Sequence, residues 1–218
     1  MIEKFLESTN LSEKANWKDI RDFVKEANEL NVLGVCTYIY WSGIVDKYLK
    51  EGIKKIYVIG FYTGSKELIE RDLSLVSDTK ADEYDVVLPL AYFSVGNISK
   101  TEELLLKVRK ATKDKVLKVI IETNILREDP KPEEKIKSAV ELVKEIGADF
   151  IKTNTGRFPR KIDIVEDIRL IKKFTKLPIK AAGGIKTYEQ VKQLIDLGVS
   201  RIGTSTAKQI IEEENGIQ

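Results

Sequence analysis

The chain has 218 residues, of which 42% are hydrophobic and 33% are charged, and its formal net charge is +2. This size predicts a sizeable core, and the near-neutral charge gives no overall attraction to nucleic acid or membranes. Histidine is absent, which excludes Ser-His-Asp and Cys-His catalysis, histidine-ligated zinc and histidine general bases.

Other global features point to an ordinary intracellular enzyme or binding protein. A single cysteine, Cys36, excludes internal disulfides and cysteine zinc clusters. We find neither a run of about 18 apolar residues nor a signal-peptide pattern. Linkers and low-complexity tracts are also absent from the sequence. We therefore expect one domain, residues 1–218, in the cytoplasm.

Short apolar segments alternate with longer amphipathic segments along the chain. The predicted strands are a weak Lys4–Thr9, then Val32–Tyr38, Lys55–Gly60, Glu83–Leu88, Leu117–Thr123, Phe150–Thr153, Ile179–Ala182 and Arg201–Gly203. The predicted helices are Trp17–Leu30, Gly43–Glu51, Lys66–Lys80, Lys100–Thr112, Lys131–Ile146, Ile162–Lys176 and Thr187–Leu197. Asp163 or Asp167 could cap the sixth helix, and Thr187 with Gln190 has the pattern of a capping box. The glycines that end helices before the next strand are Gly52, Gly147 and Gly198.

This alternation predicts a parallel sheet, because each strand is followed by a helix that returns the chain to the same edge. Eight such units in a chain of this length favour a closed (β/α)8 TIM barrel. An open doubly wound sheet would call for a Gly-x-Gly-x-x-Gly pattern after the first strand, which the sequence lacks. We expect functional residues at the C-terminal ends of the strands.

Two lysines lie at matching positions near the ends of neighbouring predicted strands, Lys152 and Lys180. A charged lysine in an apolar strand is unfavourable unless it is paired or functional. We interpret Lys152 as a nucleophile that forms a Schiff base with a carbonyl, and Lys180 as a neighbour that disfavours a second positive charge by repulsion. The alternative is that both extend from the strand edge into solvent.

Three further polar residues lie in predicted strands. Asp85 is either a strand-start residue at the solvent edge or a buried carboxylate that positions a lysine and relays protons. Lys118 and Glu122 share one face of the strand Leu117–Thr123, which predicts an ion pair inside the barrel. Cys36, in an apolar strand, is expected to belong to the core.

Glycine-rich segments follow the last three predicted strands. These segments are Gly156-Arg157, Gly183-Gly184 and Gly203-Thr-Ser205. Glycines let backbone N–H groups approach an anion, and the last two loops of this barrel are its usual phosphate site. A Gly-Gly pair is also common in plain turns, so a turn is the alternative.

Several segments together resemble the deoxyribose-phosphate aldolase family. They are Val58-Ile-Gly-Phe61, Asp82-Glu-Tyr-Asp-Val-Val87, Lys118-Val-Ile-Ile-Glu-Thr123, Gly147-Ala-Asp-Phe-Ile-Lys-Thr-Asn-Thr-Gly156, Lys180-Ala-Ala-Gly-Gly-Ile-Lys-Thr-Tyr188 and Arg201-Ile-Gly-Thr-Ser205. The matches run in order from about residue 7 to residue 207. The lysine-containing segments are the most specific, because length, order and spacing all agree.

The resemblance implies a class I aldolase that uses neither a metal nor another cofactor. Such an enzyme cleaves 2-deoxy-D-ribose 5-phosphate reversibly to D-glyceraldehyde 3-phosphate and acetaldehyde. By position, Lys152 is the Schiff-base lysine, Lys180 its activating neighbour and Asp85 the proton-transfer residue. The phosphate-binding residues implied in the same way are Gly156, Arg157, Gly183, Gly184, Lys186, Gly203 and Ser205. Barrels of this type suggest a homodimer or homotetramer.

The sequence departs from many family members near the substrate end of the pocket. Glu7-Ser8-Thr9 replaces Asp-His-Thr, Tyr62 replaces a proline, and Tyr38-Ile-Tyr-Trp41 replaces a segment with Asn-Pro or Tyr-Pro. These changes bear on substrate preference and rate more than on reaction type. Two alternatives remain, a class I aldolase for another phosphorylated sugar and a non-catalytic barrel that binds a sugar phosphate. A pure binding protein has no use for a desolvated lysine pair.

Overall fold

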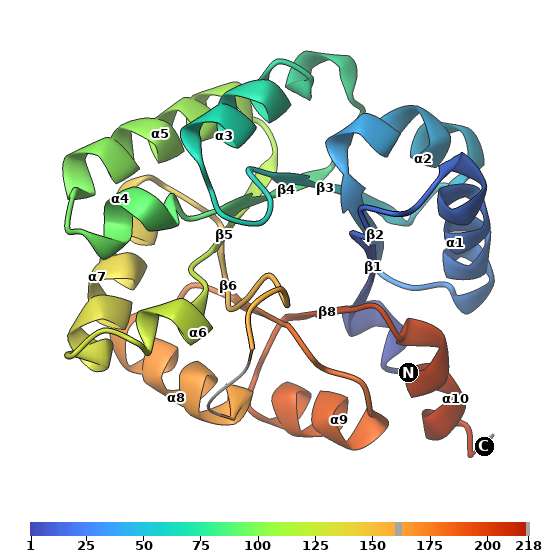
Figure 1. Cartoon of the computed structure of the whole chain (residues 1–218). Helices are drawn as coiled ribbons and strands as arrows, with labels where there is room; N and C mark the ends of the chain where they lie inside the picture. The colour runs from blue at the N-terminus through green and yellow to red at the C-terminus, as the bar shows by residue number, and fades with distance from the viewer. Residues whose placement is uncertain (160–162, 217–218) are drawn as a thin grey trace.

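A computed structural model of the chain describes residues 1–159 and 163–216. Eight parallel strands pair in chain order and close into a barrel, because β1 also pairs with β8 (Figure 1). The strands are β1 (Leu6–Asn10), β2 (Gly34–Tyr38), β3 (Lys54–Ile59), β4 (Glu83–Val87), β5 (Val116–Ile120), β6 (Phe150–Lys152), β7 (Ile179–Ala182) and β8 (Arg201–Thr204). The predicted (β/α)8 barrel is confirmed.

Helices surround the barrel (Figure 1). They are α1 (Trp17–Leu30), α2 (Ser42–Tyr48), α3 (Lys66–Leu73), α4 (Leu90–Ser94), α5 (Ile98–Ala111), α6 (Thr123–Leu126), α7 (Pro132–Glu145), α8 (Ile164–Phe174), α9 (Tyr188–Asp196) and α10 (Ala207–Glu214). The short 3-10 helices are η1 (Glu3–Phe5), η2 (Ile39–Trp41) and η3 (Val76–Asp78). The sequence did not predict α4, α6 or α10. Among the described helices, none has the length and apolar character needed to cross a membrane.

Several predicted boundaries differ from the structure, and three of them have a local explanation or bear on the loops. The strand predicted to reach Thr123 ends at Ile120, because Glu122 has a left-handed backbone (φ 55°) and α6 begins directly after it. The helix predicted over Lys66–Lys80 ends at Leu73, and η3 follows as a separate turn. The helix predicted from Ile162 begins at Ile164, and Ile162 itself lies outside the described residues.

The helix caps follow the local chemistry of the sequence. Asp163 caps α8, since its side chain accepts a hydrogen bond from the Val165 backbone N–H at 3.0 Å. Asp167 is instead an interior residue of α8. Thr187 and Gln190 form the predicted capping box of α9. These caps fix where the last two long helices start, and hence the length of the loops after β6 and β7.

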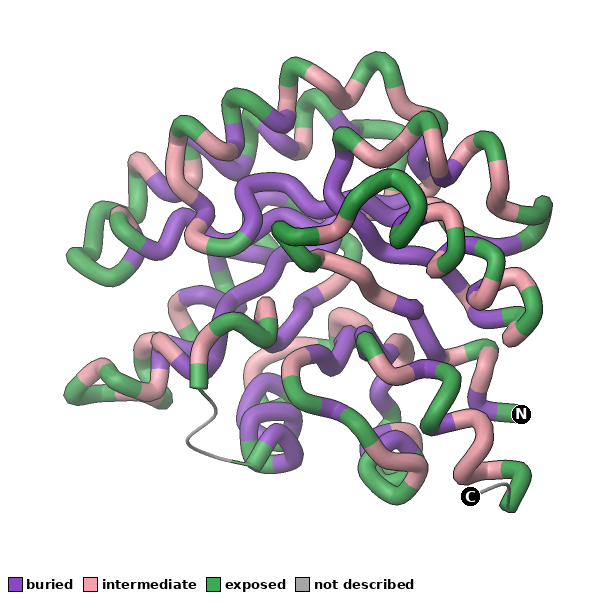
Figure 2. Tube along the Cα trace, turned by 45° about the vertical axis from the view of Figure 1, so that its right-hand side comes forward, coloured by how far each residue is buried: buried purple, intermediate pink, exposed green. Residues whose placement is uncertain are grey.

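Side chains on the two faces of the strands differ in character. Successive strand residues point to opposite faces, so Tyr84 points outward, whereas Glu83 and Asp85 point into the barrel. The outward side chains pack against the helices and form the apolar core. Most of the strand residues are buried, shown in purple in Figure 2. Burial of each such side chain contributes about 1.5–3 kcal/mol. This outer layer stabilises the fold, and the barrel interior is free to hold charge.

Candidate active site

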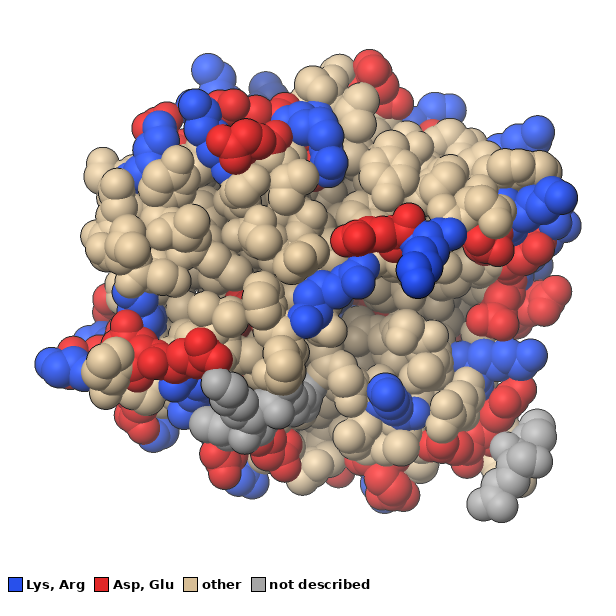
Figure 3. Space-filling model, viewed as in Figure 1, with Lys and Arg blue, Asp and Glu red and all other residues tan. Residues whose placement is uncertain are grey.

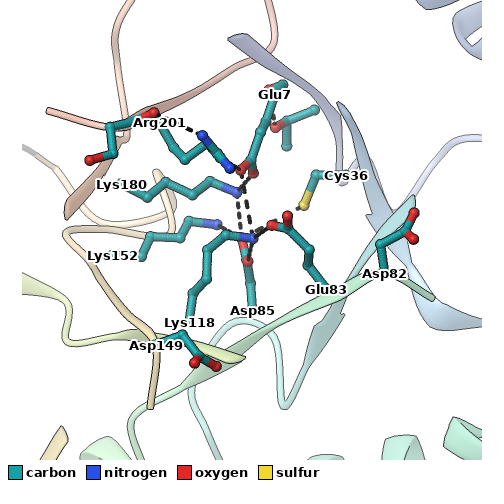
Figure 4. A network of polar contacts seen from close by, with 12 residues as sticks. Glu7, Cys36, Asp82, Glu83, Asp85, Lys118, Asp149, Lys152, Lys180 and Arg201 are labelled. Carbon is teal, nitrogen blue, oxygen red and sulfur yellow. Dashed lines mark hydrogen bonds and ion pairs between the residues drawn. The ribbon is translucent and has the colours of Figure 1, made fainter. Parts of the chain in front are cut away.

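Asp85, in the middle of β4, is the centre of a buried group of charges (Figure 4). Its Oδ2 accepts hydrogen bonds from Lys152 Nζ at 2.9 Å and from Lys180 Nζ at 2.6 Å. Its Oδ1 accepts one from Lys118 Nζ at 3.1 Å. All four side chains are at most 3% exposed. Asp85 is therefore not a solvent-edge residue, and neither Lys152 nor Lys180 extends into solvent.

Strand register brings these side chains together. Asp85 lies opposite Lys118 of β5, and Lys152 of β6 lies opposite Lys180 of β7. Paired residues of neighbouring parallel strands point to the same face, so all four side chains project into the barrel. The matching positions of the two predicted lysines in the sequence thus correspond to direct neighbours in the sheet.

Two carboxylates that the sequence analysis did not assign to the site complete this group. Glu7 of β1 accepts a hydrogen bond from Lys180 and has an oxygen 3.6 Å from Lys118 Nζ. Glu83 of β4 forms an ion pair with Lys118. Glu7 is fully buried in a short strand, and the same signal that identified the lysines, a charge within a buried strand, could have identified it.

The predicted ion pair between Lys118 and Glu122 is wrong. Lys118 pairs instead with carboxylates of β1 and β4. Glu122 lies beyond the end of β5, where the strand period no longer sets its direction, and its Oε2 accepts a hydrogen bond from the Thr155 backbone N–H at 2.8 Å. Its carboxyl group is buried, and burial raises the pKa of Glu122. Glu122 therefore holds the loop after β6.

Charges around Asp85 and Lys180 hold both in their ionised forms. Burial by itself would raise the pKa of Asp85, but the ammonium groups of Lys118, Lys152 and Lys180 hold it well below its usual range. Burial by itself would lower the pKa of Lys180, but Asp85 and Glu7 hold it well above its usual range. Lys180 is thus a fixed cation, and it shares Asp85 Oδ2 with Lys152.

The group formed by these ion pairs, the interior cluster, has one more base than acid. Its members are Glu7, Glu83, Asp85, Lys118, Lys152, Lys180 and Arg201, which lies 3.7 Å from Glu7. Deprotonation of one lysine would balance the charges. Among the described residues Lys152 has a single carboxylate partner, Asp85, whereas Lys180 has two and Lys118 has three. Lys152 is therefore the lysine of the interior cluster with the fewest ion pairs among the described residues.

A pocket of about 660 Å³ opens at the C-terminal ends of the strands, and Lys152 lines it. The face of the molecule seen in Figure 3 is hollowed near its centre, and basic side chains lie beside the hollow. All the residues predicted for phosphate binding line this pocket: Gly156, Arg157, Gly183, Gly184, Lys186, Gly203 and Ser205. The structure thus brings the predicted phosphate residues and the predicted nucleophile into one cavity.

Two of these glycines are required by close packing. Gly183 has a φ of 96°, and a Cβ there would lie 3.0 Å from Asn154 Cβ, so the loops after β6 and β7 can touch. A Cβ on Gly203 would lie 3.0 Å from Lys180 Cε. Gly203 therefore also makes room for the Lys180 side chain, which the sequence did not indicate.

Cys36 of β2 is buried, as predicted, and its Sγ lies 4.0 Å from Asp85 Oδ2. Burial raises the pKa of this thiol, which favours the uncharged form. Among the described residues, no group of three or more Asp, Glu, Cys or His side chains is arranged to hold a metal ion.

Comparison with known proteins shows the family of this chain. The model of the DeoC/LacD family of aldolases matches residues 7–213. The chain is 35% identical to a deoxyribose-phosphate aldolase from Caldicellulosiruptor saccharolyticus, with 98% of each chain covered. It is similar to the solved structure of an aldolase named QR15, with 34% identity, a TM-score of 0.89, and 99% of this chain and 96% of that chain covered. It is also similar to the tetrameric deoxyribose phosphate aldolase from Aeropyrum pernix, with 27% identity, a TM-score of 0.83, and 100% and 92% covered.

Proposed function

Because the chain belongs to the DeoC/LacD family of aldolases, we propose that it is a class I aldolase. Its reaction is the reversible cleavage of 2-deoxy-D-ribose 5-phosphate to D-glyceraldehyde 3-phosphate and acetaldehyde. The observation that carries this proposal is the position of Lys152. Of the three lysines around Asp85, it is the one that lines the pocket and has the fewest carboxylate partners.

The first step is formation of a Schiff base. Neutral Lys152 Nζ attacks the C1 aldehyde of the open-chain sugar and forms a carbinolamine, which loses water to give an iminium ion. Lys180 supports this step, since a fixed cation that shares Asp85 Oδ2 disfavours a second charge on Lys152. The buried carboxylates of Asp85 and Glu7 keep the amines of Lys152 and Lys180 in place before substrate binds.

Cleavage then breaks the C2–C3 bond. Asp85, directly or through a water molecule, accepts the proton of the C3 hydroxyl as the C3 carbonyl forms. The bonding electrons move to C2 and neutralise the iminium, which leaves an enamine on Lys152. Protonation of C2 and hydrolysis of the imine release acetaldehyde. The positively charged imine accepts the electrons, so the reaction proceeds without a metal or another cofactor.

The phosphate group binds at the loops after β6, β7 and β8. Backbone N–H groups near Gly156, Gly183, Gly184 and Gly203 supply neutral donors, and Ser205 supplies a hydroxyl. Lys186, an exposed residue of the loop after β7, supplies a positive charge. Arg157 lines the same pocket from the loop after β6. Phosphate bound here directs the aldehyde end of the sugar towards Lys152.

Further features accompany this proposal. We place the enzyme in the cytoplasm. We treat residues 1–218 as one domain, since β1 pairs with β8 and closes a single barrel. It works as a homo-oligomer, which is supported by the tetrameric relative from Aeropyrum pernix. Its partners are the phosphorylated sugar and acetaldehyde.

Trapping of the imine tests the reaction. The protein is incubated with 2-deoxyribose 5-phosphate or with acetaldehyde and reduced with borohydride, and the modified peptide is identified by mass spectrometry. We expect an adduct on Lys152 that is absent in Lys152→Ala and retained when the surface residue Lys107 is changed to Ala. Folded wild-type protein that gives no adduct, yet binds a phosphate analogue, would instead support a non-catalytic sugar-phosphate-binding barrel.

A further inference from the structure

The guanidinium of Arg157 spans the mouth of the pocket. Its Nη2 donates a hydrogen bond to the Leu11 carbonyl, in the loop after β1. Its Cζ lies 5.7 Å from the centre of the Phe61 ring and 5.9 Å from that of Tyr62, both in the loop after β3. Leu11, Phe61 and Arg157 all line the pocket. One side chain thus connects three loops around the cavity.

Aromatic contacts extend this connection. Tyr62 packs edge-on against Phe158, with ring centres 5.8 Å apart, so the loops after β3 and β6 also touch next to Arg157. Phe61 packs edge-on against Tyr38 at the end of β2, at 5.7 Å. Burial raises the pKa of Tyr38, and the nearby Arg157 opposes that rise. The Arg157 guanidinium therefore lies near aromatic side chains at the end of β2 and in the loop after β3.

These partners belong to the loops after β1 and β3 and not to the loops after β7 and β8, although the loop after β1 is next to the loop after β8 because β1 pairs with β8. A guanidinium that stacks on rings and donates to a carbonyl is already oriented by the protein, as arginine allows through its planar shape. The predicted role of Arg157, a positive charge for the phosphate, needs the same group to face the loops after β7 and β8. Its observed contacts point to loops after β1 and β3 instead.

We propose that Arg157 is a positioning residue that holds the loops after β1 and β3 over the sugar, independently of the phosphate charge. This inference rests on the proposed function, because it concerns the same pocket. It assigns recognition of the phosphate dianion to the backbone donors and Lys186. We call the contacts of Arg157 with Leu11, Phe61 and Tyr62 the bridge. The bridge should affect substrates with and without a phosphate group equally.

Lysine in place of arginine separates the two roles. A lysine keeps the positive charge and is an effective phosphate ligand, but its ammonium group is a point charge without the planar fork that lets arginine contact two rings and donate to the Leu11 carbonyl at the same time. If Arg157 acts as a bridge, Arg157→Lys and Arg157→Ala should behave alike. If it binds phosphate, Arg157→Lys should retain most of the activity that Arg157→Ala loses.

The experiment compares kcat/KM for 2-deoxyribose 5-phosphate and for 2-deoxyribose in wild type, Arg157→Lys, Arg157→Ala and Lys186→Ala. We expect both Arg157 variants to lower kcat/KM about three- to tenfold for both sugars, the scale of one or two cation–π contacts. The ratio between the two sugars should stay within about twofold of wild type for the Arg157 variants and fall at least about fivefold for Lys186→Ala. Melting temperatures show that each variant is folded.

A double variant adds a second readout. Tyr62→Ala should weaken activity on its own and add little to Arg157→Ala, since both remove the same contact. The inference is overturned if Arg157→Lys restores wild-type activity, if Arg157→Ala selectively impairs the phosphorylated sugar, or if the two substitutions are fully additive. Failure of the proposed function looks different, because wild-type protein would then cleave neither sugar.

Discussion

Glu103 on α5 and Asp85 in β4 are both carboxylates held between lysines, but water surrounds the first and is excluded from the second. Glu103 lies 2.7 Å from Lys100 and 2.9 Å from Lys107 on the helix surface, and these ion pairs lower the pKa of Glu103 to about 2. Solvent screens such pairs, and they contribute little to stability. Asp85 makes three similar contacts with full burial.

The difference favours a functional rather than a stabilising role for the interior cluster. Removing an ion from water costs several kcal/mol, and well-packed apolar residues in its place are often neutral or stabilising. The barrel already has an apolar layer between strands and helices, so it does not depend on interior charges for its core. A cluster of this kind is expected where lysines and a carboxylate are needed at fixed positions for chemistry.

The largest effect is expected from loss of the nucleophile. Lys152→Ala should reduce kcat by about 10⁴-fold or more, because the other lysine that lines the pocket, Lys186, is in the exposed loop after β7 and is assigned to the phosphate. Stability should change little, since the cluster then has three carboxylates and three remaining bases. Steady-state kinetics and thermal unfolding measure both quantities. A variant that keeps normal activity would exclude Lys152 as the nucleophile.

Loss of the central carboxylate should affect activity and stability together. Asp85→Asn should lower kcat by about 10²- to 10⁴-fold, the range for a proton-transfer residue. It should also lower the free energy of unfolding by about 3–5 kcal/mol, since three buried ammonium groups lose a shared partner. Denaturant titration measures the second effect. An Asp85→Asn variant as stable as wild type would mean that the stability of the fold does not depend on the Asp85 carboxylate.

Two of the buried carboxyl groups, Asp85 and Glu122, should give pH dependences of opposite sign. The pKa of Asp85 is lowered in the folded state, so its contribution to stability is present above its ordinary pKa and is lost as the pH falls. The pKa of Glu122 is raised, so its contribution is present below its ordinary pKa and is lost as the pH rises through the folded value.

Glu122→Gln tests this difference in sign. The variant should gain stability relative to wild type as the pH rises from acid towards neutral, because glutamine stays uncharged and can still accept the Thr155 hydrogen bond. Melting temperatures of both proteins across that range measure the effect, with Asp85→Asn as the matched comparison of opposite trend. Parallel curves for Glu122→Gln and wild type would contradict the raised pKa.

The smallest effect is expected at the surface. Glu103→Gln should leave the melting temperature and kcat within experimental error of wild type, because its lysine partners remain solvated. Raising the salt concentration should remove any residual difference. A large loss of stability would show that surface ion pairs matter as much as the interior cluster in this protein.

The sequence predicted the barrel and the pair of lysines because both depend on local, repeated signals. Strand–helix alternation is visible in the hydrophobic pattern, and Lys152 and Lys180 lie at equivalent positions in adjacent repeats. Glu7 was not assigned to the site because its strand, Leu6–Asn10, is polar and its partner Lys180 lies 173 residues away in the chain. The direction of the Arg157 side chain could not be predicted, because it depends on the conformation of the loops after β1 and β3. Loops have no periodic sequence pattern from which their conformation could be inferred.

Glu122 shows the limit of pattern reasoning at a strand end. A period of two predicts its direction only while the strand continues, and β5 ends at Ile120. The left-handed backbone at Glu122 then turns the carboxyl group towards the loop after β6. No turn residue such as glycine or asparagine marks this reversal in the sequence.

The contact between Glu7 and Lys180 joins positions 173 residues apart in the chain. Contacts between such distant residues form late, because a long loop must be closed first. Lys180 therefore lacks one of its two neutralising carboxylates until the first and last strands meet. Aldolase activity during refolding should consequently follow barrel closure rather than early collapse.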